Sequence, residues 1–307
     1  MIYVFYHCPC HDGIYGALAA HRHFLRLGVE VTYVPHAFNA SEEVREQWLS
    51  PITEFDDVYL IDNSGTVKFL LALCEKAGKV ILLDHHKGAQ VMIDKLKDSG
   101  EVPSNLSWTI NMEKSGATIA MNYFGMTKED ATVLDTVFVL VEDHDLWRHK
   151  YDDSRAFFMG LVNLKLDMYA DRNPSIFDKL MNLDVVRVIK EGHELVESMD
   201  ARMAPILATA SVIHFGDISC LYVTNTEVDL TSELGHRLSI LGTQREGDIL
   251  YPMGAIVRPP KDGKVSISLR SIGEFFCRDV AIKYGGEGHA QACGMLVSEE
   301  IFNSMIA

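Results

Sequence analysis

Imidazole, thiol and carboxylate side chains gather where apolar segments of the chain end. The set that could bind metal comprises His7, Cys10, Asp12, Asp62, His85 and Asp143. Carboxylates and imidazoles suit Mn²⁺, Fe²⁺, Zn²⁺ or Co²⁺, and one carboxylate can bridge two ions about 3.5–4 Å apart. Because acids crowded together repel one another, divalent cations are the physical means of keeping them all ionised. The residue types therefore predict a site for a pair of divalent metal ions.

The segments that precede these side chains have the pattern of buried strands. Residues 2–6, 31–36, 57–64 and 79–86 contain short apolar runs rich in β-branched and aromatic residues, and the last two segments end in polar residues. Residues 13–28 and 69–78 have helical spacing. This alternation predicts a parallel sheet with crossover helices. Ligands collect at the carboxyl ends of such strands, so the polar residues that follow them should converge.

Length and pattern favour two domains. Among the 307 residues, we expect an α/β domain over residues 1–185, a helical linker over 186–210 and a smaller α+β domain over 211–307. In the first domain, residues 115–124 and 128–147 should be helical, with an acidic cluster at the end of the second helix. The last domain contains β-type runs and finishes in a glycine-rich segment.

Charge and cysteine content restrict the partners and the compartment. The net charge of −15 disfavours a broad basic face that could hold long duplex nucleic acid, but not a small anion received by metals. Six cysteines in a chain of this length do not form a disulfide scaffold. The first residues lack the pattern of a signal peptide, and no apolar run approaches a membrane span. We therefore expect a cytoplasmic protein without a membrane anchor.

Several ordered motifs resemble the DHH phosphoesterase superfamily. The sequence VILLDHH contains Asp84, His85 and His86, and GGEGH resembles the GGGH motif of the DHHA1 domain. The blocks HCPCHDG, IDNS and EDHDLW stand in the expected order. The resemblance spans nearly the whole chain. It implies a bilobal fold, a dinuclear centre usually served by Mn²⁺, and hydrolysis of phosphoester or phosphoanhydride bonds.

The resemblance also implies roles for individual residues of the first domain. The metal-ligand positions of the family fall on His7, Asp12, Asp62, His85 and Asp143, with Asp62 as the bridge between the ions. His144 and Asp145 remain alternatives to Asp143. Asp84 would orient a neighbouring histidine, and His86 would face the phosphate as a hydrogen-bond or proton donor.

Cys10 is the one clear departure from the family pattern, because most relatives have an aspartate at this position. A thiolate ligand would favour Zn²⁺ or Fe²⁺ over Mn²⁺. The alternative is that Cys10 is a small buried side chain without a metal role.

The second domain is expected to bind the phosphates of the substrate. By resemblance, the residues involved are Arg270, Gly285, Gly286, Gly288 and His289. Arginine pairs with phosphate through two hydrogen bonds, and glycine lets the backbone approach closely.

The main hypothesis is a metal-dependent phosphodiesterase for small phosphodiesters such as short oligonucleotides or dinucleotides. One alternative enzyme is an exopolyphosphatase or pyrophosphatase that cleaves phosphoanhydrides. A second alternative is a non-catalytic protein that binds a nucleotide and regulates a partner. The sequence leaves open whether the chain forms a homodimer, and the acidic net charge argues against an exonuclease for long single strands.

Overall fold

The structure is a computed structural model that describes residues 1–125, 134–244, 250–288 and 290–306. The chain divides into two compact units, Met1–Val196 and Glu197–Ala307. Each unit has its own sheet and its own buried core. Helix α9, Val185–Leu207, corresponds to the helical segment expected between the two domains, and the division between the units falls within it.

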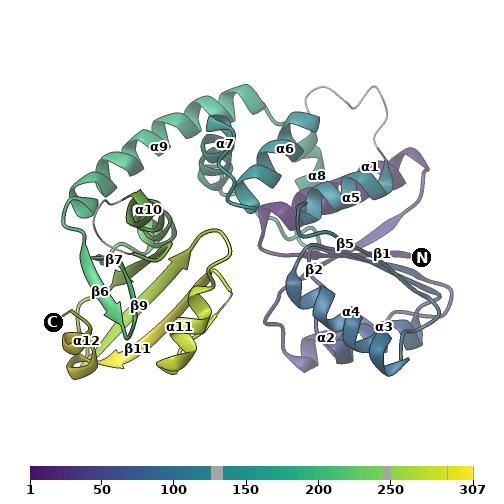
Figure 1. Cartoon of the computed structure of the whole chain (residues 1–307). Helices are drawn as coiled ribbons and strands as arrows, with labels where there is room; N and C mark the ends of the chain where they lie inside the picture. Colours follow the sequence, from purple (N-terminus) through teal and green to yellow (C-terminus); the bar gives the residue numbers. More distant parts are fainter. Residues whose placement is uncertain (126–133, 245–249, 289, 307) are drawn as a thin grey trace. The chain divides into compact units, whose positions relative to one another are not determined.

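The first unit is built on a five-stranded sheet in the order β2-β1-β3-β4-β5, in which every pairing is parallel (Figure 1). The strands are β1 Ile2–His7, β2 Val31–His36, β3 Asp57–Ile61, β4 Lys79–Asp84 and β5 Leu106–Ile110. Parallel strands buried on both faces require continuous apolar sequence, which these segments have. The predicted parallel sheet with crossover helices is confirmed.

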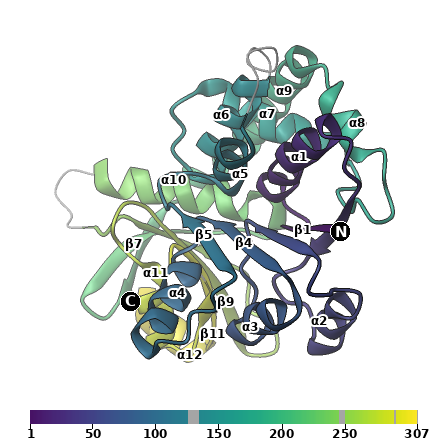
Figure 2. The ribbon, with the colours of Figure 1, turned by 90° about the vertical axis from the view of Figure 1, so that its right-hand side faces the viewer.

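Helices cover both faces of this sheet (Figure 2). Val4 and Tyr6 of β1 belong to one buried cluster, whereas Tyr3 and Phe5 point to the opposite face and belong to another. Alternation along one strand therefore serves two cores. The helices of this unit before α9 are α1 His11–Arg26, α2 Glu42–Leu49, α3 Val67–Lys76, α4 Lys87–Ser99, α5 Gly116–Phe124, α6 Leu134–Asp145, α7 Asp152–Asn163 and α8 Ile176–Met181.

The carboxyl ends of β1, β3 and β4 lie side by side because these strands are parallel neighbours. The residues that close or follow them are His7, Asp62 and His85. Helix α6 ends at Asp145 and supplies the acidic cluster expected there. Residues 128–133 of the predicted 128–147 helix lie outside the described residues.

The second unit contains a six-stranded sheet in the order β10-β11-β9-β8-β7-β6, antiparallel except between β7 and β8. Its strands are β6 Ser211–Phe215, β7 Ile218–Thr224, β8 Met253–Val257, β9 Lys264–Ser271, β10 Glu287–Gly288 and β11 Ala292–Ser298. Its helices are α10 Thr231–Gln244, α11 Cys277–Lys283 and α12 Glu299–Ile306, with a 3₁₀ turn η1 at Val228–Leu230. The mixed sheet with helices confirms the predicted α+β class of this part.

Among the described residues of both units, no helix combines the length and apolar character that a membrane span requires.

Candidate metal centre

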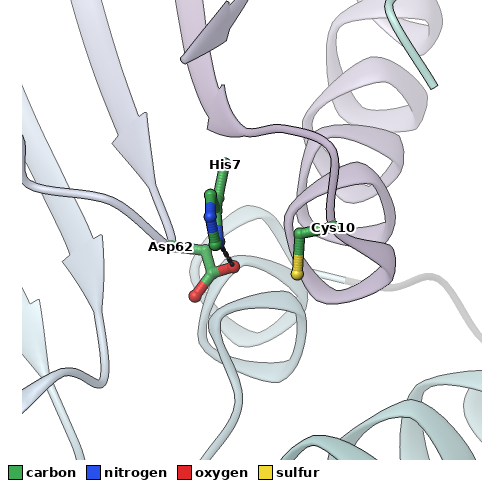
Figure 3. A group of neighbouring side chains, drawn as sticks. All are labelled: His7, Cys10 and Asp62. Carbon is green, nitrogen blue, oxygen red and sulfur yellow. Dashed lines mark hydrogen bonds and ion pairs between the residues drawn. The ribbon is translucent and has the colours of Figure 1, made fainter. Parts of the chain in front are cut away.

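His7, Cys10 and Asp62 point toward one another from three elements (Figure 3). His7 ends β1, Cys10 precedes α1, and Asp62 follows β3. The His7 Nδ1 atom lies 3.2 Å from Asp62 Oδ2. One ligand atom from each of the three side chains lies within 4.8 Å of the other two. This is the spacing that a shared cation requires.

His85 extends this group toward two further carboxylates. Its Nε2 atom lies 3.1 Å from Asp62 Oδ1, 3.6 Å from Asp145 Oδ2 and 3.8 Å from Asp12 Oδ2. Asp62, His85 and His86 form a second group of ligand atoms, and Asp12, His85 and Asp145 form a third. Because the groups share Asp62 or His85, they form one continuous cluster, in which Asp62 faces His7 with one oxygen and His85 with the other.

The backbone at the start of α5 holds the carboxylate of Asp12. The Gly116 N–H donates to Asp12 Oδ2 at 2.6 Å, and the Ala117 N–H donates to Asp12 Oδ1 at 2.9 Å. The first N–H groups of a helix have no partner within the helix, so they are available to a carboxylate. Asp12 is therefore fixed in place by α5 as well as by α1.

The backbone of Asp62 adopts a conformation that few side chains accept, with φ of 61°. Aspartate tolerates the left-handed region better than most residues, but a positive φ outside glycine still carries strain. Gly116 packs directly against this residue: a Cβ atom at position 116 would lie 2.5 Å from the Asp62 Cβ and 2.9 Å from its Oδ1. The absence of a side chain at Gly116 therefore makes room for the Asp62 carboxylate.

Asp84 is positioned to orient the histidines that follow it. Its Oδ1 accepts hydrogen bonds from the backbone N–H of His85 at 2.7 Å and of His86 at 3.0 Å. The same oxygen lies 2.8 Å from His86 Nδ1, which is the donor in the tautomer that this contact selects. About half of the His86 side chain is exposed, so its ring reaches the solvent side of the cluster while Asp84 holds it from within.

The structure favours Asp145 over Asp143 as the acid contributed by α6. Asp143 accepts hydrogen bonds from the backbone N–H of Lys150 and Tyr151 and from the Ser154 hydroxyl. These donors occupy both of its oxygens and tie it to the start of α7. Asp145 faces His85 instead. In the structure the Asp143 carboxylate therefore binds the loop before α7, and Asp145 lies in the cluster beside His85.

Burial and mutual repulsion perturb the protonation of the cluster. Burial raises the pKa of Asp12 well above its ordinary value, and the charges of Asp145 and Asp62 raise it further. The pKa of Asp145 rises to about 6 for the same two reasons, burial and then Asp62. Burial alone would raise the pKa of Asp62, but its close contacts with the imidazoles of His7 and His85 outweigh burial and lower the value. Asp62 is thus the acid that its neighbours hold most firmly in the charged form.

The histidine beside these acids is shifted in the opposite sense. Burial lowers the pKa of His85, but the ion pair with Asp62 and the charge of Asp145 dominate and raise it to about 10. Burial raises the pKa of the Cys10 thiol well above its ordinary value, and the charges of Asp62 and Asp12 add to this effect. A cation at this place would stabilise the carboxylates and the thiolate together and release the proton of His85.

Two buried oxygens fit this requirement for a cation. Asp62 Oδ1 and Asp145 Oδ2 are inaccessible to water and accept no hydrogen bond from the described residues. Such an oxygen costs free energy unless a donor or a cation satisfies it. Together with the imidazoles, they provide the mixed nitrogen and oxygen ligands that suit Mn²⁺, Fe²⁺ or Zn²⁺. The residues present therefore fit a metal centre.

A pocket lined partly by rings adjoins the cluster. It is bordered by Asp12 and Asp145 on one side and by His11, His144 and Phe158 on another. The rings of His144 and Phe158 are stacked with centroids 3.7 Å apart, and His11 meets Phe158 edge-on at 5.2 Å. Burial lowers the pKa of His11 to about 4 and that of His144 to about 3, so both rings are neutral at pH 7.

The predicted phosphate-binding residues lie in the second unit and are described within it. Arg270 is on β9, and its guanidinium donates to the Leu269 carbonyl at 2.8 Å and to Ser232 Oγ at 3.2 Å. Gly285 and Gly286 follow α11, and Gly288 is on β10 with φ of 135°. That conformation is open to glycine and to few other residues. His289 lies outside the described residues.

Comparison with known proteins gives relatives along most of the chain. No protein-family model matches it. It is 24% identical over 305 residues to the uncharacterized protein R106 of Acanthamoeba polyphaga mimivirus, covering 96% of this chain and 67% of the viral protein. It is 25% identical over 248 residues to oligoribonuclease NrnB of Bacillus subtilis, covering 75% of this chain and 56% of that enzyme.

Among solved structures, the pGpG-specific phosphodiesterase PggH of Vibrio cholerae has the same fold. The match has a TM-score of 0.55 at 14% identity and covers 99% of this chain and 95% of PggH. The fold, the converging strand-end acids and the DHH motif agree with one another. The chain therefore shares the fold of PggH and carries motifs that resemble those of the DHH/DHHA1 superfamily. Three residues of these motifs, His7, Asp62 and His85, lie at one edge of the sheet in the first unit.

Three features of the site were not predicted from the sequence. The sequence offers Asp145 only as an alternative to Asp143 for the metal-ligand position. The hydrogen bonds from Gly116 and Ala117 to Asp12 join residues more than a hundred positions apart. The pocket depends on packing between α1, α6 and α7. The only sequence signal was the motif SGA before a predicted helix, which places free N–H groups at residues 116 and 117.

The two aspartates of α6 should respond differently to substitution. Asp145→Ala should weaken Mn²⁺ binding by about a hundredfold or more, because it removes a proposed ligand. Removing a residue that only orients a ligand lowers metal affinity by roughly 10–100-fold, and loss of a ligand itself should cost more. Asp143→Ala should instead destabilise the protein by about 1–3 kcal/mol, because buried donors lose their acceptor. Titration calorimetry and chemical unfolding measure the two effects. Loss of metal binding in Asp143→Ala alone, at unchanged stability, would contradict the assignment.

Substitution at Gly116 should damage the site without changing a ligand. In Gly116→Ala the new methyl group meets the Asp62 side chain, so the carboxylate must shift and Mn²⁺ affinity should fall at least tenfold. Gly88→Ala is the matched control, because a Cβ atom there meets nothing within 4 Å. Calorimetric titration of both variants tests this. Equal affinity in Gly116→Ala and the control would show that Gly116 is not needed for the site.

Proposed function

We propose that this protein is a metal-dependent phosphodiesterase that hydrolyses short oligonucleotides or dinucleotides at a dinuclear centre. The observation that carries the proposal is the convergence of Asp12, Asp62, His85 and Asp145 at one sheet edge. Two of these carboxylates have a buried oxygen without a hydrogen bond from the described residues. A purely structural role would leave these charges uncompensated.

In this proposal, His7, Cys10 and Asp62 would hold one ion, and Asp12, His85 and Asp145 would hold the other. When bound, such a pair of ions lowers the pKa of water and neutralises charge that develops on a phosphate. The protein contributes the geometry. The N–H groups of α5 fix Asp12, and Gly116 leaves the space that Asp62 occupies.

The ring of His86 is the part of this chain best placed to meet the scissile phosphate. It is half exposed at the rim of the cluster, and Asp84 accepts a hydrogen bond from its Nδ1. The Nε2 atom is then left to contact the substrate. Burial lowers the pKa of His86, but the hydrogen bond and charge of Asp84 outweigh this and raise it, which favours a protonated donor. Within the second unit, Arg270 and the glycines of residues 285–288 are proposed to bind phosphate.

Two observations support a nucleotide as substrate. The relative NrnB is an oligoribonuclease, and PggH, which shares the fold, is specific for pGpG. The pocket beside Asp12 and Asp145 contains the rings of His11, His144 and Phe158, and both histidines are neutral at pH 7. Neutral rings attract a flat base by stacking, whereas they offer no charge to an extended polyphosphate.

A substrate panel tests the proposal. The protein loaded with Mn²⁺ should hydrolyse the linear dinucleotides pGpG and pApA and a short oligoribonucleotide, and it should act poorly on tripolyphosphate. Chromatographic separation of the products gives each rate. Hydrolysis of tripolyphosphate alone would reject the phosphodiesterase in favour of a phosphoanhydride hydrolase. Binding of nucleotides without turnover under any of Mn²⁺, Fe²⁺, Zn²⁺ or Co²⁺ would favour the non-catalytic alternative.

The role of Cys10 has a spectroscopic test. If its thiolate binds a metal, Co²⁺ loading should produce sulfur-to-cobalt charge-transfer absorption in the near ultraviolet, and Cys10→Asp should abolish it while retaining two bound ions. The same substitution should shift preference from Zn²⁺ toward Mn²⁺. Cys8→Ser is the control, because the Cys8 thiol is directed to the Met168 carbonyl. An unchanged cobalt spectrum in Cys10→Asp would make Cys10 a spectator.

A further inference from the structure

Two cysteines of the second unit lie in direct contact, far along the chain from the metal centre. Cys277 is the first residue of α11, and Cys293 is on β11. Their sulfur atoms are 3.3 Å apart, and the two positions are separated by 16 residues. Both are free thiols in the structure. None of the roles assigned above uses either of them.

We propose that Cys277 and Cys293 are a redox-active pair that a hydroperoxide converts reversibly to a disulfide. The geometry carries the proposal. A disulfide has sulfur atoms about 2.05 Å apart, so the sulfurs need to approach by only roughly 1.3 Å in total. Adjacent positions on a helix start and a neighbouring strand allow this without unfolding either element.

Neighbouring groups make the Cys277 sulfur the more reactive of the two. The Cys277 N–H donates to Ser271 Oγ at 3.2 Å, and its thiol lies 3.6 Å from the Ala290 carbonyl. The hydrogen bond from Cys293 is the largest influence and lowers the pKa of Cys277 to about 7, with further help from Ser271 and Arg270. The same contact raises the pKa of Cys293. Cys277 is therefore the thiolate that reacts first, and Cys293 is the thiol that reacts second.

The reaction balances with one hydroperoxide. The Cys277 thiolate attacks the peroxide O–O bond, which breaks and releases water or an alcohol, and Cys277 becomes a sulfenic acid. The Cys293 sulfur then attacks the Cys277 sulfur, and its proton leaves with the hydroxide as a second molecule of water. Two thiols are oxidised and one peroxide is reduced. A dithiol reductant reverses the bond by exchange.

Burial decides how fast and how selectively this happens. Cys277 is fully buried and Cys293 is 6% exposed, so bulky thiol reagents are excluded, while a molecule as small as hydrogen peroxide can enter during local opening. The resulting bond would close a loop that contains Gly285, Gly286 and Gly288. It would thus tie α11 to β11 on either side of the segment proposed to bind phosphate, although the inference does not depend on that proposed function.

The experiment is peptide mapping of the full-length protein after treatment with millimolar hydrogen peroxide and a chelator that suppresses metal-catalysed oxidation. We expect loss of the Cys277 and Cys293 thiols and a cross-linked peptide that contains both residues. The cross-link should disappear with dithiothreitol. The midpoint of thermal unfolding should be roughly 5 °C higher in the oxidised form, because the bond restricts the unfolded chain.

Two variants give the matched comparison. In Cys293→Ala, the Cys277 sulfenic acid has no partner, so it should form a dimedone adduct when the oxidised protein is unfolded in the presence of dimedone, whereas the wild-type protein should form none. Cys220→Ala should still form the cross-link, because Cys220 is another fully buried thiol of the same core. Survival of all thiols, or separate oxidation of Cys277 and Cys293 without a cross-link, would overturn the proposal. If Cys293→Ala fails to fold, the wild-type map alone still decides between these outcomes.

Discussion

Repulsion among buried carboxylates is the constraint on which the rest of the first unit depends. Asp12, Asp62 and Asp145 lie within reach of a single imidazole. Asp12 and Asp62 are buried and Asp145 is partly buried, so little water screens their charges. His85 offsets part of this charge, but two carboxylate oxygens still accept no hydrogen bond among the described residues. A fold optimised for stability alone would not assemble such a cluster. Divalent cations bound at this place would supply the missing positive charge.

The parallel sheet brings these polar side chains together without placing them inside its apolar core. Its strands are apolar on both faces, so polar residues are excluded from their length and appear only where they end. The fold also tolerates local strain at the site. Asp62 has a positive φ, and residue 116 is a glycine, which leaves room for the Asp62 side chain. Strain of this kind persists where the surrounding structure holds it in place, and it commonly marks functional positions.

Sequence reasoning could predict the sheet and the convergence of His7, Asp62 and His85, because strand periodicity and the parallel arrangement determine where these side chains emerge. It could not choose between Asp143 and Asp145. Both lie in the last turn of α6, and the choice depends on which carboxylate is taken by the backbone N–H groups of residues 150 and 151. That loop geometry has no periodic signal. The pairing of Cys277 with Cys293 depends likewise on contacts between an antiparallel strand and a helix.

Anomalous diffraction from crystals grown with Mn²⁺ tests the central claim most directly. The account predicts two manganese peaks about 3.5–4 Å apart, with Asp62 between them, Cys10 beside one and Asp145 beside the other. A map with no peak at this sheet edge, or with manganese only at exposed acids elsewhere on the surface, would contradict it.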